Sequence, residues 1–269
     1  LMSALGIFGC YTFRGGLGGR GGWVRGGGGG GYRGVGLSDL RGFYGSVPFS
    51  QACRAHGLRA VHGCRVRVEG IGMVQLTVRN EAGYRALSAA LTRWNERMRE
   101  GGVREVPPVT QGALGALWEG SGDDLLLSFP GTGEAGEAAA PVHHWLGRFG
   151  RLARVVGRES IWVELGWHTE AERGLQRGIY RALRGEGEAP PRFVVQTGAR
   201  LPAGTAFDRL EVLQSIGTLT LRGQAHPEKL SRGDYALPRR EELQERFAKA
   251  PEVLLDTAEF ASRADFDFT

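Results

Sequence analysis

The chain has few cysteines, no long apolar run and no basic leader. Its three cysteines, Cys10, Cys53 and Cys64, are too few and too scattered for a disulfide framework or a zinc site, so each is expected to be a small buried hydrophobe. No apolar run approaches the roughly 20 residues that a membrane-spanning helix needs. The opening LMSALGIFGCY lacks the basic residues that begin a secretory signal, which favours a cytoplasmic protein.

The bulk composition is that of an ordinary globular protein. With 269 residues, 41% hydrophobic and 23% charged, the chain can form one barrel-sized domain or two small ones. The net charge of +5 fits a protein that works near nucleic acid. The arginines are spread along the whole chain, so a diffuse solvated surface explains the charge equally well.

Glycine is in excess, with 45 residues, and it is concentrated between Gly15 and Gly36. Six glycines stand in a row at positions 26–31. Each costs roughly 1 kcal/mol relative to alanine in a helix interior, which predicts a frayed helix or a flexible loop. A phosphate-cradling loop is the alternative, but it requires a defined spacing between a strand and a helix that a plain glycine run does not specify.

Strand-like and helix-like patterns alternate along most of the chain. Predicted strands cover 58–68, 73–78, 124–129, 161–166 and 192–197, and predicted helices cover 46–57, 80–94, 134–157 and 169–184. The first of these helices places Val47, Phe49, Ala52 and Cys53 on one face. The segment 101–122 is rich in glycine and proline and is predicted to be a connection. This alternation favours an α/β fold with a largely parallel sheet, followed from Asp208 by mostly helical chain.

The segment from Val35 to Val68 reads VGLSDLRGFYGSVPFSQACRAHGLRAVHGCRVRV. This stretch resembles the start of the PHP (polymerase and histidinol phosphatase) domain at the N-terminus of bacterial DNA polymerase III alpha subunits. Where that family reads Leu-Thr-Asp-His-Gly-Asn-Leu-Tyr-Gly, this chain reads LSDLRGFYG, and where it reads Gly-Ile-Lys-Pro-Ile-Ile-Gly-Cys-Glu, this chain reads GLRAVHGCR. Two C-terminal segments, 235–247 and 251–263, also resemble the family. The resemblance implies a PHP-like distorted (β/α)7 barrel over 1–207 and a mainly helical segment over 208–269.

The same resemblance implies that a metal site has been lost. The family's histidine is replaced by Leu40 and its glutamate by Arg65, and neither side chain can ligate a metal. Asp39 remains at the strand end, where it is either a vestigial ligand or a turn residue. His168, in VELGWHTEAE, lies where the family often has a histidine and is the second vestigial position. We therefore expect no catalytic residue and no cofactor; the alternative is zinc or manganese held by Asp39, His168 and His62.

Two charged groups have a functional and a structural interpretation. Asp123 and Asp124 beside Glu119 are an acidic pair for acid–base chemistry or the cap of a buried strand. A second group has near-helical spacing and consists of Arg148, Arg151, Arg154 and Arg158. These arginines form either a stripe that contacts phosphates or a solvated helix face.

The resemblance implies a non-catalytic PHP-like domain with a structural or interaction role in DNA replication or error-prone repair synthesis. Spacing around VELGWH and VLQSIGTLT favours the error-prone branch. The expected partner is a DNA polymerase core or another replication or repair protein, with DNA contacted indirectly and no membrane. Because the family's catalytic palm lies downstream, the chain is not expected to polymerise DNA alone. The alternatives are a metal-dependent phosphoesterase with a reduced ligand set and a decayed gene product; Leu1 in place of methionine indicates a fragment or a split gene.

Overall fold

The structure is a computed structural model that describes residues 3–7, 20–100, 107–131, 141–166, 168–185, 190–201, 207–226, 229–230 and 232–268. For residues 3–7, 20–23 and 97–100 it describes the backbone alone. No helix in these ranges is both long and apolar enough to cross a lipid bilayer. The predictions made for residues 15–19 and 101–106, and for Cys10, lie outside the described residues.

Strands and helices alternate along the described chain. The strands are β1 (Ser3–Ile7), β2 (Gly34–Leu40), β3 (Arg59–Val68), β4 (Gly72–Val78), β5 (Leu125–Pro130), β6 (Ile161–Leu165) and β7 (Arg192–Val195). The α-helices are α1 (Arg20–Gly29), α2 (Ser46–Ala55), α3 (Glu81–Glu100), α4 (Gln111–Ser121), α5 (Val142–Val156), α6 (Glu170–Gly185), α7 (Phe207–Thr218), α8 (Arg240–Arg246) and α9 (Pro251–Arg263).

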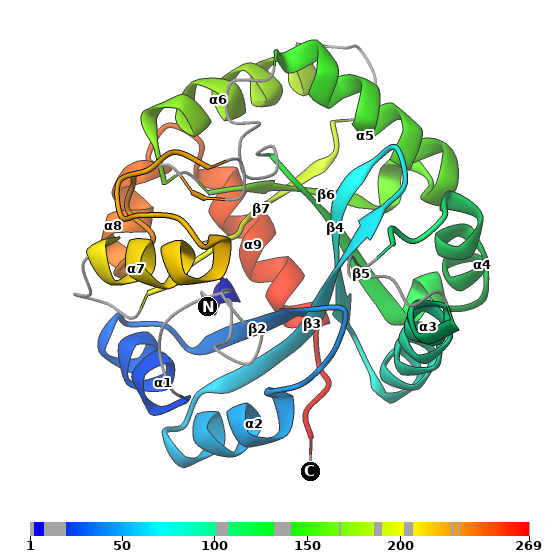
Figure 1. Cartoon of the computed structure of the whole chain (residues 1–269), viewed down its shortest axis with the longest axis horizontal. Helices are drawn as coiled ribbons and strands as arrows, with labels where there is room; N and C mark the ends of the chain where they lie inside the picture. Colours follow the sequence, from blue (N-terminus) through cyan, green and yellow to red (C-terminus); the bar gives the residue numbers. More distant parts are fainter. Residues whose placement is uncertain are drawn as a thin grey trace.

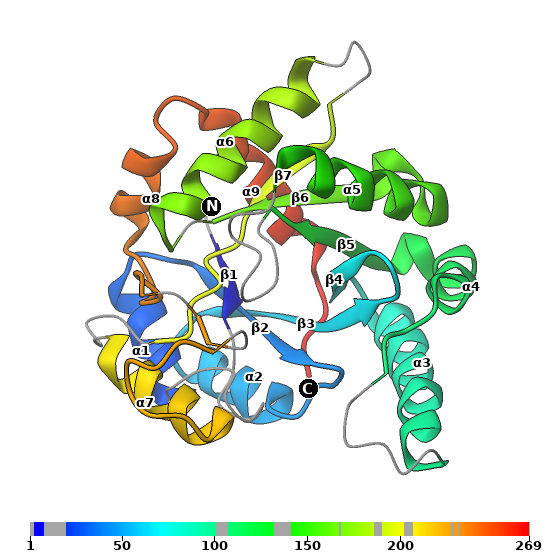
Figure 2. The same cartoon turned by 45° about the horizontal axis from the view of Figure 1, so that its top comes forward.

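The seven described strands form one curled sheet in the order β1-β2-β3-β4-β5-β6-β7. The pairs β1–β2, β2–β3, β5–β6 and β6–β7 are parallel, whereas β4 runs antiparallel to both β3 and β5. Figure 1 shows α1 to α6 around the outside of the curl and α9 inside the ring. The turned view in Figure 2 shows the same arrangement. This confirms a mixed α/β fold, while exact (β/α)7 closure stays a prediction.

The two faces of the sheet bury different clusters because successive side chains of a strand point to opposite faces. The outer face belongs to the main core, in which Leu127 and Val163 pack with helix residues such as Trp145. The inner face has a smaller cluster with α9, made by Val61, Leu126, Trp162, Val194, Phe260, Ala261 and Ala264. Helix α9 therefore fills one end of the space that the curled sheet encloses.

Within the described part of the glycine-rich segment, residues 20–29 form α1 and residues 34–36 already belong to β2, so the structure has the helix and not the loop at 20–29. Val24 of α1 is fully buried. A Cβ on Gly27 would lie 2.5 Å from Cγ1 of Val35, so this glycine lets α1 approach β2 closely. Gly31 has a φ of +78°, a left-handed conformation that glycine adopts without a steric cost, and it ends the run.

The prediction that residues 101–122 form a connection was wrong for the second half of the segment, which forms α4. Thr110 caps this helix by accepting a hydrogen bond of 3.2 Å from the Ala113 amide. Leu114 and Leu117 are buried in the main core. The N-cap and these two contacts outweigh the low helix propensity of the glycines in this segment.

Two further predictions are corrected or remain open. Val47 was predicted on the packed face of α2 but is 48% exposed, and Ser46 and Ser50 are buried there instead. The boundary between 1–207 and 208–269 stays a prediction. Leu243 and Val253, from the predicted helical segment, belong to the same main core as the strands.

Candidate functional site

Polar side chains line the inner face of the sheet beyond the α9 cluster. Leu126 and Trp162 point inward, and two residues further along the same strands Ser128 and Glu164 must do the same. Arg65 stands on this face too, because it lies four residues after Val61 in β3. The inner space therefore has an apolar end filled by α9 and a polar end at the carboxyl ends of β5 and β6.

A buried ion pair occupies the polar end. Nη2 of Arg65 lies 3.1 Å from Oε2 of Glu164, and the two side chains are only 14% and 5% exposed. Ser128 donates a hydrogen bond of 2.7 Å to the other oxygen of Glu164. Nε of Arg65 donates to Gln75 at 3.3 Å. Both members of the pair are thus held by neutral neighbours as well as by each other.

Electrostatics keeps this pair ionised. Burial lowers the pKa of Arg65 and raises the pKa of Glu164, and in each case the partner's charge opposes the effect of burial. An arginine side chain stays protonated in proteins, and the Ser128 hydrogen bond also favours the carboxylate. Arg200 adds a second positive charge near Arg65, and burial and Arg65 together lower the pKa of Arg200 to about 10.

These charges oppose a divalent cation at the polar end. A unit positive charge 4 Å from a guanidinium is repelled by about 4 kcal/mol at an effective dielectric near 20. The resemblance aligns Arg65 with a metal-ligating glutamate of the family. The ion pair therefore occupies a place where the resemblance implied a metal ligand. Among the residues that the structure describes, no three His, Cys, Asp or Glu side chains are grouped so that they could hold a metal ion.

Asp39, the first of the two positions predicted to be vestigial metal ligands, has a structural partner. It is 1% exposed at the end of β2, and its carboxylate accepts a hydrogen bond of 3.3 Å from the amide of Gly45, just before α2. In the sheet register it pairs with Cys64, a residue of the outer core. Asp39 thus joins the end of β2 to the turn before α2, and its role as a vestigial ligand stays a prediction.

His168, the second position predicted to be a vestigial ligand, lies after β6 in a small pocket that includes Gly166, Thr197 and Arg246. Its ring stacks on Tyr235 with centroids 4.3 Å apart, and its Nδ1 lies 2.7 Å from the carbonyl oxygen of Asp234. Because a carbonyl oxygen only accepts, Nδ1 carries the proton. Burial lowers the pKa of His168 to about 4, so the ring is neutral at pH 7.

His62, the third residue of the alternative ligand set, points to the outer side. It is 1% exposed, with its ring beside Phe49 of α2 and Phe266 and Phe268 of the C-terminal tail. Burial lowers the pKa of His62 to about 4, although the nearby Asp267 carboxylate acts in the opposite direction. Asp39, His168 and His62 are therefore not brought together into one described group.

Ser50, His62 and Asp267 lie in contact with one another, and the sequence did not predict this group. The Ser50 hydroxyl donates to Asp267 and lies 2.9 Å from Nε2 of His62, so that His62 donates to Ser50. The hydroxyl stands between imidazole and carboxylate, an order that does not activate a nucleophile, and Ser50 is fully buried. The set joins the C-terminal tail to α2. No sequence signal could show it, because Ser50 and Asp267 are 217 positions apart.

The other charged candidates also have structural contacts. Asp124 accepts a hydrogen bond of 2.7 Å from Asn80, so it joins β5 to the start of α3 as a cap residue would. In the arginine group, Arg151 donates to the Gly70 carbonyl at 2.6 Å and Arg158 lies over the Phe149 ring at 5.4 Å. Cys53 and Cys64 are buried, as predicted, and burial raises the pKa of Cys53 to about 12.

Glu164 is the residue of the polar end that the sequence could have revealed. It interrupts the apolar strand IWVEL, in which every residue is buried. A carboxylate in such a strand requires a partner, because an unpaired buried charge costs several kcal/mol. The identity of the partner, 99 positions earlier in the chain, was not visible.

Sequence comparison relates the chain to a polymerase subunit. It is 26% identical over 247 residues to the DNA polymerase III subunit alpha of Neisseria meningitidis serogroup B, covering 87% of this chain and 21% of the relative. The serogroup A protein of the same name is 25% identical over the same span. The chain thus spans about a fifth of the length of these curated relatives. No family model matches it.

Among solved structures, one similar chain is from Bifidobacterium adolescentis and is assigned as a metal-dependent phosphoesterase. The superposition covers 92% of this chain and 96% of that one, with 12% sequence identity and a TM-score of 0.44.

Proposed function

The chain is a PHP-domain relative of bacterial DNA polymerase III alpha subunits, and from this premise we propose that it is a non-catalytic PHP domain with a structural or interaction role in DNA synthesis. The observation that carries the proposal is the buried Arg65–Glu164 pair. It supplies fixed charges of both signs at the carboxyl ends of the strands, where a metal-dependent enzyme of this fold would gather its cations. The ion pair joins β3 to β6. Because the charge of Glu164 is balanced by that of Arg65, the pair offers no surplus negative charge to attract a metal.

The partner we propose is a DNA polymerase core, in replication or in error-prone repair synthesis. The relatives are DNA polymerase subunits about five times the length of the matched region, which supports a polymerase context. We propose that DNA is reached through this partner and not directly. The error-prone branch, favoured by the spacing around VELGWH, and the cytoplasmic location are parts of the same proposal.

The alternative proposal is a metal-dependent phosphoesterase with a reduced ligand set. One observation favours it: His168 is neutral, and its Nδ1 proton is engaged, so Nε2 carries the lone pair that a metal ligand needs. Against it, the proposed ligands Asp39 and His62 have other hydrogen-bond partners. The alternative requires zinc or manganese, whereas the first proposal requires neither.

Two measurements on the purified full chain separate the proposals. Elemental analysis after exposure to zinc and manganese should give well below one metal per chain, and a generic phosphodiester should not be hydrolysed. Stoichiometric metal, together with hydrolysis that is lost in Asp39→Ala, would establish the phosphoesterase instead. Co-elution with a polymerase core that lacks its own N-terminal domain tests the interaction role. If the protein binds no metal and no polymerase core, the interaction role is wrong.

A further inference from the structure

Helix α7 carries an exposed apolar stripe that continues into the turn after the helix. We call Val212, Ile216, Leu219 and Leu221 the α7 stripe. These residues are 44%, 61%, 94% and 77% exposed, respectively. The other large hydrophobic residues exposed in the described chain, Leu40, Tyr44, Val47 and Leu255, belong to other elements. A group of this kind on one helix and its adjoining turn is typical of an interaction site.

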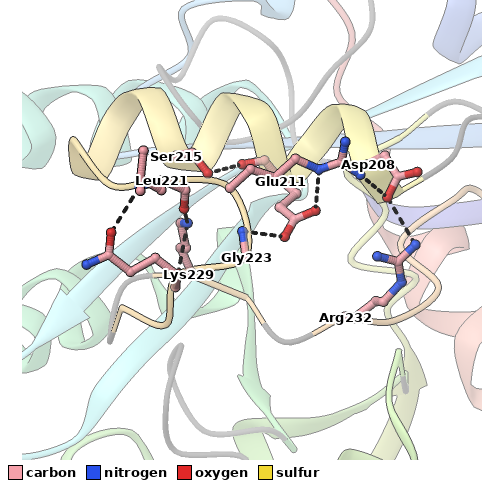
Figure 3. Close-up of polar contacts among 9 residues, drawn as sticks. Asp208, Glu211, Ser215, Leu221, Gly223, Lys229 and Arg232 are labelled. Carbon is pink, nitrogen blue, oxygen red and sulfur yellow. Dashed lines mark hydrogen bonds and ion pairs between the residues drawn. The ribbon is translucent and has the colours of Figure 1, made fainter.

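Polar contacts hold the backbone of the turn after α7 in place (Figure 3). Glu211 of α7 accepts hydrogen bonds of 3.1 Å from Nε of Arg222 and from the Gly223 amide. Lys229 donates to the Leu221 carbonyl at 2.9 Å and to the Gln224 carbonyl at 3.0 Å. The backbone on both sides of Leu221 is therefore fixed, and its side chain is presented to solvent by an ordered turn.

Leu219 is in an unfavourable backbone conformation. Its φ is +52°, a left-handed value at the end of the helix where glycine is preferred, because a Cβ there meets the backbone. The turn is closed by a hydrogen bond of 3.0 Å from the Thr220 amide to the Ser215 carbonyl, which any residue at 219 would permit. With 94% exposure, the Leu219 side chain gains almost no contact within the chain in return for this strain.

The charge at the rim of the stripe favours an acidic partner. Residues 207–232 contain four basic and three acidic side chains. Asp208 and Glu211 are occupied by ion pairs with Arg222 and Arg232. Arg209 is exposed one turn before Val212 and makes no hydrogen bond or ion pair within the described ranges. The charge available to a partner is thus positive, which disfavours a second copy of the same surface.

We propose that the α7 stripe docks an amphipathic helix of a protein partner whose leucine-sized side chains are flanked by aspartate and glutamate. Val212 and Ile216, one turn apart, form a ridge that fits beside a second helix, and Leu219 and Leu221 extend it. Arg209 pairs with the acidic flank. The inference deepens the proposed interaction role and rests on it, with the polymerase core as the source of the helix.

The first test uses a synthetic amphipathic helix of about 18 residues with a leucine face and glutamate flanks. A second peptide with the same face and lysine flanks is the control. The full chain should bind the glutamate peptide, with little binding of the lysine peptide. Leu219→Gly should weaken binding about tenfold or more, since one buried leucine contributes roughly that factor, without lowering the melting temperature. Leu255→Ser, on α9, is the matched control and should bind like the wild type.

Other outcomes overturn the docking proposal. Equal binding by Leu219→Gly, or no binding of the glutamate peptide at millimolar concentration, would do so. Binding only to vesicles that contain phosphatidylglycerol would assign the stripe to a lipid surface, and self-association lost in Leu219→Gly would assign it to a second copy. If a polymerase core bound wild type and Leu219→Gly equally, the α7 stripe would not be its docking site, but the proposed interaction with the polymerase would stand. Peptide binding without polymerase binding would contradict the polymerase role alone.

Discussion

The hydroxyl of Tyr32 donates a hydrogen bond of 3.0 Å to the carbonyl oxygen of Pro238, 206 positions later in the chain. Beside it, the Arg240 amide donates to the Gly30 carbonyl at 3.0 Å. Burial raises the pKa of Tyr32, so the hydroxyl remains a donor at neutral pH. The end of the glycine-rich helix is thereby joined to the start of α8.

Tyr32→Phe should lower the free energy of unfolding by about 1–2 kcal/mol, because the buried Pro238 carbonyl loses its donor. Urea denaturation at pH 7 measures the change. Tyr44→Phe is the control: Tyr44 is 61% exposed and its hydroxyl has one long contact of 3.5 Å with the Arg41 carbonyl, so no measurable loss is expected. Equal effects of the two substitutions would show that the Tyr32 bond does not stabilise the fold.

Neighbouring glycines of α1 should respond to alanine in opposite directions. A Cβ on Gly28 would meet no atom within 4 Å, so Gly28→Ala should raise stability by about 0.5–1 kcal/mol through its better helix propensity. A Cβ on Gly27 would lie 2.5 Å from Val35, so Gly27→Ala should lower the melting temperature. Thermal unfolding followed by circular dichroism compares the two. If both variants were stabilised, α1 would not pack on β2 as described.

Removal of one partner of the Arg65–Glu164 pair should be more damaging than removal of both. Arg65→Met leaves Glu164 buried without a counter-charge, and the expected loss is about 3–5 kcal/mol. The double variant Arg65→Met/Glu164→Gln removes both charges and should recover much of that loss. A double-mutant cycle from urea denaturation measures the coupling. Additive effects would mean that the two side chains do not interact.

Stability should fall as the pH drops below 6.5, and His62 is one of two histidines that cause the fall, with His168 as the other. The folded pKa of His62 is about 4 and its ordinary value is 6.5, so the unfolded chain binds the proton more readily. The contribution is fully present above pH 6.5 and is lost as the pH falls toward 4, by about 2 kcal/mol between pH 8 and pH 5.

The matching variant is His62→Gln, which keeps a polar group beside Ser50 but does not titrate. Its own stability is expected to be lower, since the amide fits less well among the Phe49, Phe266 and Phe268 rings. Its unfolding free energy should nevertheless decline less between pH 8 and pH 5 than that of the wild type. Identical slopes would mean that His62 does not cause the pH dependence.

Local patterns were sufficient for most of the fold. Strands β5 and β6 are short apolar runs, and α3 has apolar residues at helical spacing after the Asn80 cap, so each could be predicted from its own residues. Helix α4 was missed because its glycines and the prolines before it resemble a loop, while burial of Leu114 and Leu117 stabilises the helix. The antiparallel direction of β4 depends on pairing with β3 and β5, which no local pattern specifies.

The candidate site could be predicted only in part. The resemblance implied that Arg65 stands at a ligand position, which stays a prediction; the structure places Arg65 in an ion pair with Glu164 inside the sheet. The Glu164 partner and the support from Ser128 arise from strand pairing between β3, β4, β5 and β6 and could not be deduced from spacing. The same holds for Asp267, which reaches Ser50 only because the tail folds back over α2.

The position of α9 inside the ring has a consequence for the order of folding. Its Phe260 packs on Trp162 of the inner face, and Thr257 accepts a hydrogen bond of 2.8 Å from the Val195 amide of β7. A chain that ends before Pro251 would leave this face of the sheet in contact with water and should show no cooperative unfolding transition. During synthesis the strands leave the ribosome before α9. The curled sheet therefore cannot bury its inner face until α9 has been made.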